Sequence, residues 1–285
     1  MYKITKEGFS DLKTGEFRKS ILYTDSGYSE SWLKKQEASY DEYEETHVEG
    51  NHPAYIKNVF SFYKSITAQY ALKALDHTDL VNVLDVGCGI STKIPEYVPE
   101  SKHINYIGLD PIEKNPDRGY PFICSRLENI ENILEPGSID IFMFSTSLDH
   151  FENLDNIYPL LKKIGKKNAH IIICSGTNDA GISATLDAVN FLERFTNSVF
   201  FQKGPLGKIK YLNRLRVFNR DMLKKYNGYA LRAEKLKNKT PLDNLHFHYF
   251  ELEPYLAFLK TKMGEFVEYR KLELGWIIIS VNKIV

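Results

Sequence analysis

Two glycines and two aspartates form the most chemically informative pattern in this sequence. Gly87 and Gly89 follow an apolar run over 81–86, and Asp85 lies two residues before the first glycine. Because glycine has no Cβ atom, the backbone there can turn sharply and a ligand can approach it closely. Asp110 ends the next apolar run, 21 residues after Gly89, where an acid is placed to accept hydrogen bonds from ribose hydroxyls. The pattern therefore predicts a site for a ligand that contains a ribose.

Two neighbouring strands and a tight loop are needed to bring these residues together. Apolar runs over 81–86 and 104–109 predict central parallel strands, and Ser91 is a suitable N-cap for a helix after the loop. Further strands are expected over 120–124, 139–145 and 169–174, with helices over 54–75, 154–167 and 252–262. This alternation predicts a doubly wound α/β sheet, which binds ligands beyond the carboxyl ends of its strands.

The glycine loop distinguishes between two families that use this layout. Dinucleotide dehydrogenases carry G-x-G-x-x-G, but Thr92 occupies the position of the third glycine here. The segment Leu84-Asp-Val-Gly-Cys-Gly89 instead resembles the cofactor loop of class I S-adenosylmethionine (SAM)-dependent methyltransferases. The resemblance covers 79–176 and 246–285. It implies a Rossmann-like, doubly wound, seven-stranded sheet whose final strand is antiparallel, and the pair of runs over 265–272 and 275–283 suits such an ending.

The resemblance also implies SAM as the cofactor and assigns residues to it. The expected cofactor-binding residues are Asp85, Gly87, Cys88 and Gly89 in the loop, Asp110 and Pro111 after the second strand, Leu127 beside the adenine, and Ser145 near the methyl group. Arg126 departs from the family, since many relatives have Asp there. A guanidinium cannot accept a hydrogen bond from the adenine amino group, so we expect backbone groups near Leu127 to make that contact.

Histidines at the ends of two predicted core segments are candidates for catalysis and acceptor binding. His150 ends Ser145-Thr-Ser-Leu-Asp-His150, which follows the fourth strand. Its unperturbed pKa suits a general base for a hydroxyl acceptor, although packing against the cofactor or capping a helix would also explain it. His248 and Tyr249 are expected on the rim of the acceptor pocket, as in the family. His246 and His248 lack a clear third ligand, which favours hydrogen bonding over metal binding, and no metal is expected.

The regions outside the sheet are expected to build the acceptor site. Residues 1–78 are interpreted as an N-terminal arm and helix, irregular at first with a short helix near 31–40. This arm is either solvated or a lid whose Tyr40 and Tyr43 close over a ligand. Residues 79–285 are interpreted as the methyltransferase domain, with a helical substrate-binding insert over 177–250, because such a length is too great for a plain connection.

Charge is balanced overall but unevenly distributed. The chain has 37 Lys and Arg and 37 Asp and Glu, yet residues 201–240 hold twelve basic residues and two acids. Residues 36–52 hold six acids and no Lys or Arg. A basic surface favours anionic partners, so a phosphorylated or otherwise anionic acceptor and RNA are both candidates. Pairing of the basic segment with the acidic one is the structural alternative.

Composition narrows the compartment and the class of function. The 285 residues show 43% hydrophobic content and no apolar run of the roughly 20 residues that span a bilayer. The start lacks a signal-peptide core, and the three cysteines show no metal-ligand spacing, which favours a cytoplasmic protein with free thiols. We expect O-methylation of a small or glycan-like acceptor in a biosynthetic pathway. A nucleic-acid methyltransferase and a catalytically silent SAM-fold scaffold are the alternatives, and the oligomeric state stays open.

Overall fold

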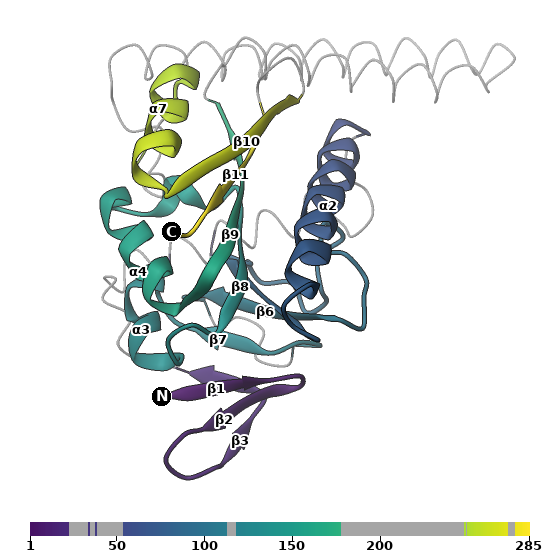
Figure 1. Ribbon diagram of the computed structural model, residues 1–285, viewed down its shortest axis with the longest axis vertical. Coiled ribbons are helices and arrows are strands. Elements are labelled where there is room, and N and C mark those ends of the chain that lie inside the picture. The colour runs from purple at the N-terminus through teal and green to yellow at the C-terminus, as the bar shows by residue number, and fades with distance from the viewer. Residues whose placement is uncertain are drawn as a thin grey trace, which may run out of the picture.

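The fold is an α/β sandwich built on one large, mainly parallel sheet (Figure 1). The computed structural model describes residues 1–22, 34, 38, 54–112, 118–177, 248, 250–272 and 277–285. Its strands are β1 (Tyr2–Thr5), β2 (Gly8–Asp11), β3 (Phe17–Arg18), β4 (Ser20–Leu22), β5 (Val81–Val86), β6 (Ile104–Asp110), β7 (Phe122–Cys124), β8 (Ile139–Ser145), β9 (Gly165–Gly176), β10 (Glu265–Leu272) and β11 (Ile277–Lys283). Its helices are α2 (Ala54–Leu75), α3 (Ile130–Ile133), α4 (Ile157–Ile164) and α7 (Leu252–Lys262), with short 3-10 helices η1 (Leu127–Asn129), η2 (Leu148–His150) and η3 (Leu154–Asn156).

The central sheet has eight strands in the order β10-β11-β9-β8-β5-β6-β7-β4. Strand β11 runs antiparallel to both of its neighbours, whereas β4 to β9 pair in parallel. The predicted Rossmann-like sheet with an antiparallel final strand is therefore present. The predicted number of seven strands is wrong, because Ser20–Leu22 adds an eighth strand beside Phe122–Cys124 at one edge. Three residues are too few to show a strand periodicity in the sequence.

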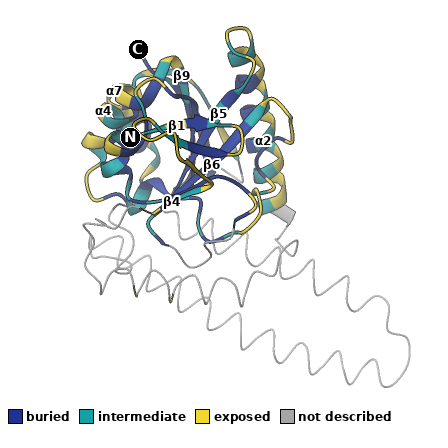
Figure 2. Cartoon of the chain, turned by 90° about the horizontal axis from the view of Figure 1, so that it is seen from below, coloured by how far each residue is buried: buried dark blue, intermediate teal, exposed yellow. Residues whose placement is uncertain are grey.

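Both faces of the sheet are covered by helices. Helices α3, α4 and α7 lie on one side and α2 on the other (Figure 1). Because side chains alternate along a strand, Leu84 and Val86 of β5 join the core on the first side, while Val81 and Val83 join the core under α2. The central strands β5, β6 and β8 are accordingly almost fully buried, whereas the edge strand β10 is partly exposed. Exposed residues gather on the outer surfaces of the helices and in the loops (Figure 2).

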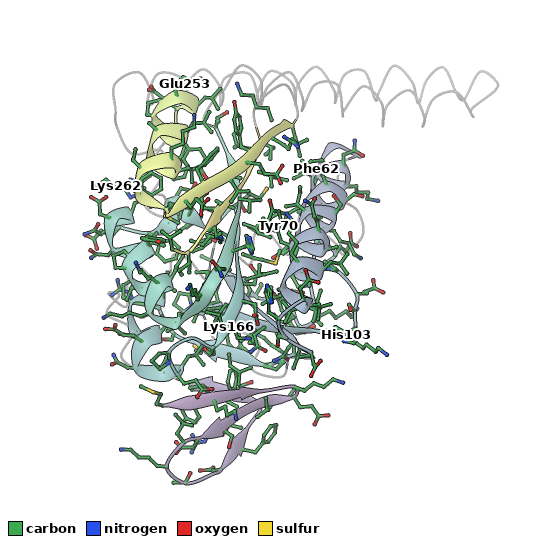
Figure 3. All side chains as sticks on the ribbon, viewed as in Figure 1. Phe62, Tyr70, His103, Lys166, Glu253 and Lys262 are labelled. Carbon is green, nitrogen blue, oxygen red and sulfur yellow. The ribbon has the colours of Figure 1, made fainter. Side chains whose placement is uncertain are left out.

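Helix α2 matches its predicted range and packs through tyrosines. Tyr63 and Tyr70 are buried, and the Tyr63 hydroxyl donates a hydrogen bond to the Ile172 carbonyl at 3.0 Å. Tyr70 lies between α2 and the sheet (Figure 3), where its hydroxyl donates to Glu268 at 2.7 Å and its ring contacts that of His170. These contacts attach α2 to β9 and β10.

The N-terminal arm departs from its prediction over its first 22 residues. Strands β1, β2 and β3 form a separate antiparallel sheet, where irregular structure was expected. Ile4 and Phe9 alternate with polar residues and are buried in the main core, which explains why this segment is extended. Lys34 and Ala38 are helical, within the predicted helix near 31–40. The remainder of that helix and the insert over 178–247 lie outside the described residues.

The helix predicted to start at Ser91 is absent. Residues 87–103 instead form turns and irregular backbone between β5 and β6. Pro95 and Pro99 explain the difference, because proline has no N–H for a helical hydrogen bond and disfavours helical geometry in the residue before it. The prediction weighed the N-cap residue and overlooked these two prolines.

In the described part of the chain, no helix is both long enough and apolar enough to cross a membrane.

Candidate functional site

The glycine loop is held in shape by its contacts with the end of β6. Gly87 and Gly89 have φ angles of 78° and 70°, a region that glycine adopts without steric cost. The Gly89 N–H donates to Oδ2 of Asp110 at 3.0 Å, and the Ile112 N–H donates to Oδ1 at 2.9 Å. Asp110 is only 2% exposed. The structure therefore places Gly89 of the predicted loop in direct contact with the predicted acid, while the Gly87 N–H donates to the Leu109 carbonyl at 2.8 Å.

A second set of contacts joins the glycine loop to the end of β8. A Cβ atom on Gly87 would lie 2.4 Å from Cβ of Ser147, so only glycine fits beside this serine. The Ser147 hydroxyl donates a short hydrogen bond to the Val86 carbonyl. Strands β5 and β8 are adjacent, and the chain continues from β5 to β6 on the opposite side. This is a topological switch point, where open α/β sheets bind their ligands.

Thr146 adds a strained residue at the same place. Its φ angle is 58°, in the left-handed region that residues other than glycine rarely adopt. Its N–H donates to the Cys174 carbonyl of β9 at 2.8 Å, which holds the turn after β8 against the next strand. Strain of this kind concentrates at functional sites, so it supports placing a site at the ends of β5 and β8.

Asp85 is turned into the protein core under the loop. Its Oδ2 accepts hydrogen bonds from the Tyr97 and Tyr106 hydroxyls, both at 2.8 Å, and its buried Oδ1 has no hydrogen-bond partner among the described residues. Burial raises the pKa of Asp85 to about 6, although the hydrogen bonds from Tyr106 and Tyr97 favour the charged form. Burial also raises the pKa of both tyrosines, with the charge of Asp85 adding to the effect, so they remain neutral donors.

Cys88 fills space between the loop and β6. A Cβ atom on Gly108 would lie 2.7 Å from the Cys88 sulfur, which shows how tightly the thiol packs there. Burial raises the pKa of this thiol well above its ordinary value, and the charges of Asp110 and Asp85 add to the effect. A thiol in this state is a poor nucleophile, so its side chain serves as packing. All three cysteines of the chain are free.

The residues predicted near the adenine are arranged around the end of β7. The Ser125 N–H donates to the Asp110 carbonyl at 3.1 Å, which places this segment next to the loop. The Pro111 carbonyl accepts a weak hydrogen bond from the Cys124 thiol. The Leu127 side chain is buried in the core, so only its backbone could face a ligand. Arg126 forms an ion pair with Glu128 at 2.9 Å. Because Arg126 directly precedes η1 and Glu128 lies in it, this ion pair is a local contact.

The predicted catalytic and acceptor-binding segments meet after β8. Ser145 is the half-buried last residue of β8, and His150 ends η2 with its Nε2 4.0 Å from Oδ1 of Asp149. The His248 N–H donates to the Asp149 carbonyl at 3.3 Å, although the two residues lie about a hundred positions apart. Tyr249, Tyr40 and Tyr43 lie outside the described residues.

A column of stacked rings extends from His248 toward α7. The His248 and Phe250 rings are nearly parallel with centroids 6.3 Å apart, and Phe250 stacks on Tyr255 at 4.4 Å. His248 Nε2 is buried, and the described residues give it no hydrogen-bond partner, whereas the Tyr255 hydroxyl interacts with Ser175. Unsatisfied buried polar groups are rare in proteins, so His248 Nε2 is a candidate for contact with an acceptor.

Sequence reasoning missed four residues of this region: Arg118, Ser147, Tyr97 and Tyr106. Ser147 lies inside the segment that was singled out, but a serine two residues after a strand carries no signal of its contact with Gly87. Tyr97 and Tyr106 are recognisable only once their hydroxyls are seen to meet at Asp85.

Across the described residues, no group of three or more His, Cys, Asp or Glu side chains could hold a metal ion.

No protein-family model and no curated protein matches this chain. Solved structures share parts of its fold. The plantazolicin methyltransferase BpumL in complex with a triazolic desmethylPZN analog and SAH (S-adenosylhomocysteine) is 14% identical, with a TM-score of 0.45 over 88% of this chain and 92% of that chain. With the pentazolic analog and SAH, the values are 20% and 0.38, over 55% of this chain and 60% of that one. A SAM-dependent methyltransferase from Aquifex aeolicus is 14% identical, with a TM-score of 0.40 over 79% and 98% of the two chains.

Proposed function

We propose that this protein is a class I SAM-dependent methyltransferase. One observation carries the proposal. Two glycines with positive φ lie at the switch point between β5 and β8, where Gly89 contacts Asp110 and Gly87 lies against Ser147. A nucleoside ligand at this point would lie over the loop, with its ribose hydroxyls beside the Asp110 carboxylate. The two carboxylate oxygens accept the backbone N–H groups of Gly89 and Ile112, which fixes the carboxylate at the edge of the loop.

The local structure favours SAM over a dinucleotide. Dinucleotide sites place the pyrophosphate at the N-terminus of the helix that follows the glycine loop, and here no helix is present between 87 and 103. SAM has no phosphate and can bind through its ribose, adenine and amino-acid groups. The lack of Cβ atoms at Gly87 and Gly89 lets such a ligand approach the loop backbone closely. Gly87, Cys88, Gly89, Asp110 and Pro111 would hold it, with Ser145 near the reacting end.

The chemistry assigned to the chain's own residues is orientation and proton transfer. When bound, SAM supplies an electrophilic methyl group on a sulfonium. His150, which ends η2 shortly after β8, would take the proton from an acceptor hydroxyl. His248 offers a hydrogen-bonding atom that would orient the acceptor for in-line attack.

For the acceptor we propose a hydroxyl of a small or glycan-like molecule in a biosynthetic pathway. A histidine base suits a hydroxyl, and the basic stretch over 201–240 suits an anionic or phosphorylated substrate. In this proposal the part of the N-terminal arm that holds Tyr40 and Tyr43 acts as a lid over the cofactor, whereas β4 belongs to the sheet and α2 covers it. Residues 177–250 line the acceptor pocket, in a cytoplasmic enzyme. An RNA substrate is the alternative that the same basic stretch supports, and its affinity would fall steeply with added salt.

Calorimetric titration of SAM and SAH tests the cofactor site. The wild-type protein should bind both, and Asp110→Ala should lose both because the loop and the ribose lose their shared carboxylate. Asp140→Ala is a matched control. Asp140 is also a buried acid that accepts a backbone N–H, from Asn82 at 2.9 Å. It lies near the start of β8, at the end of the strand away from the glycine loop. This variant should bind SAM as the wild type does. A folded wild-type protein that binds neither ligand would refute the proposal.

The base assignment has its own test, once an acceptor is found among phosphorylated sugars and glycans. His150→Ala should lower turnover and remove the limb of the pH profile that reports deprotonation of the base, while SAM affinity stays unchanged. Near-normal turnover with an unaltered pH profile would show that His150 only packs or caps η2.

A further inference from the structure

A buried guanidinium lies directly behind the glycine loop. Arg118 is 2% exposed, and its Nη1 donates to the Gly89 carbonyl at 2.7 Å and to the Tyr120 hydroxyl at 2.8 Å. The Tyr120 hydroxyl in turn donates to the Ser91 carbonyl at 2.6 Å, which Nη1 also reaches at 3.4 Å. The guanidinium carbon lies 3.7 Å from the centroid of the Phe122 ring. The Arg118 guanidinium therefore stacks on the Phe122 ring and donates hydrogen bonds to carbonyls of the glycine loop.

These contacts replace the restraints that a helix would have supplied. Residues 89–92 are outside any helix, so no i to i−4 hydrogen bonds fix the direction of their peptide groups. Arg118 and Tyr120 hold the carbonyls of Gly89 and Ser91, and the Gly119 N–H holds the Thr92 carbonyl at 2.7 Å. Because a trans peptide is planar, a carbonyl directed at residues 118–120 turns the N–H of the next residue the opposite way.

Two oppositely charged side chains bind the backbone N–H and the carbonyl of Gly89. Its N–H is bound by the Asp110 carboxylate and its carbonyl by the Arg118 guanidinium. Glycine has the largest conformational freedom to lose on ordering, so a loop that depends on it needs such external restraint. Only a planar guanidinium can stack on Phe122 and still donate to several acceptors in one plane.

We propose that Arg118 is a positioning residue for the cofactor site, which sets the conformation of the loop over 87–92 without touching the ligand. The inference rests on the proposed function, because the loop is argued to receive SAM. Through Arg118 the loop is already in its binding conformation before the ligand arrives. Without Arg118, the binding-competent population falls and the apparent dissociation constant rises by the same factor.

The test compares Arg118→Lys and Arg118→Ala with the wild type, using calorimetric titration of SAM and hydrogen exchange of the amides over 87–92. Loss of a buried hydrogen bond to a charged group should weaken SAM binding by about tenfold or more in Arg118→Ala. Arg118→Lys should lie between the two, since an ammonium keeps the charge but not the stacked fork. In both variants exchange should accelerate over 87–92.

Two further variants separate positioning from general stability. Ile133→Ala removes a buried side chain from the core on the other face of the sheet, and should lower the thermal midpoint with an unchanged dissociation constant for SAM. Tyr120→Phe removes the hydroxyl between Arg118 and Ser91 with little change of shape, and should weaken SAM binding by several-fold even if Arg118→Ala fails to fold.

The outcomes are distinguishable. Wild-type affinity for SAM in folded Arg118→Lys and Tyr120→Phe, with unaltered exchange over 87–92, would overturn the inference and leave the proposed function intact. Absence of SAM and SAH binding by the wild type would overturn the proposed function and with it the cofactor role, while the exchange rates would still report whether Arg118 orders the loop.

Discussion

Replacement of Gly87 by alanine should be far more damaging than one added methyl group suggests. The φ angle of 78° at this position costs a residue with a Cβ atom about 1–2 kcal/mol. The new Cβ would also lie 2.4 Å from Cβ of Ser147, and overpacking of this kind costs about 1–3 kcal/mol. Ser147 cannot simply rotate away, because its Cβ is the atom in contact and its hydroxyl is bound to the Val86 carbonyl. The expected loss in the free energy of unfolding is therefore about 2–5 kcal/mol.

The chain offers a matched control for the backbone cost alone. Gly137 has a φ angle of 66°, and no atom lies within 4 Å of the position its Cβ would take. Gly137→Ala should therefore cost only about 1–2 kcal/mol. Urea denaturation measures each variant, and an unchanged m value is required for the comparison.

A double-mutant cycle isolates the clash. Ser147→Gly removes the atoms that alanine at position 87 would meet, so Gly87→Ala/Ser147→Gly should be more stable than the sum of the single changes predicts. The expected coupling is about 1–3 kcal/mol, the size of the overpacking cost. Additivity within about 0.5 kcal/mol, or a Gly87→Ala loss no larger than that of Gly137→Ala, would show that the contact between the two loops is not as close as described.

Three further predictions concern buried ionisable groups. Burial raises the pKa of Asp85 from 3.8 to about 6, so the folded protein binds more protons than the unfolded chain between these pH values. The stability of the wild type relative to Asp85→Asn should therefore fall by up to about 3 kcal/mol as the pH rises through this interval. Burial lowers the pKa of His170 to about 4 from 6.5, so there the unfolded chain binds more protons, and the stability of wild type relative to His170→Gln should rise with pH across that interval. The two trends oppose each other, so urea unfolding of each pair across pH 4–7 is needed, and a flat difference would contradict the respective assignment. Asp110→Asn should cost about 1–3 kcal/mol in the same assay at pH 7, because an amide can accept from the N–H of Gly89 or Ile112 but not from both; an unchanged midpoint would mean that these amides find other partners.

Features encoded in contiguous residues were predictable from the sequence. The 22-residue helix Ala54–Leu75 and the strand Val81–Val86 match their predicted ranges, because apolar spacing and buried runs report directly on the local backbone. The glycine loop and Asp110 were also identified correctly as neighbours, since consecutive parallel strands bring their carboxyl ends to one edge of the sheet. Even here local competition mattered: Pro95 and Pro99 prevail over the N-cap signal of Ser91.

Only the tertiary structure decided the partners of individual side chains. The sequence by itself determined an α/β sheet with a glycine loop beside Asp110, but it could not show Asp85 facing two tyrosine hydroxyls or Arg118 behind Gly89. Nor could it show the contact between His248 and Asp149, or β4 as an eighth strand. The physical reason is that periodicity tells which face of an element is buried, whereas hydrogen-bond partners depend on residues that meet only after the strands have paired.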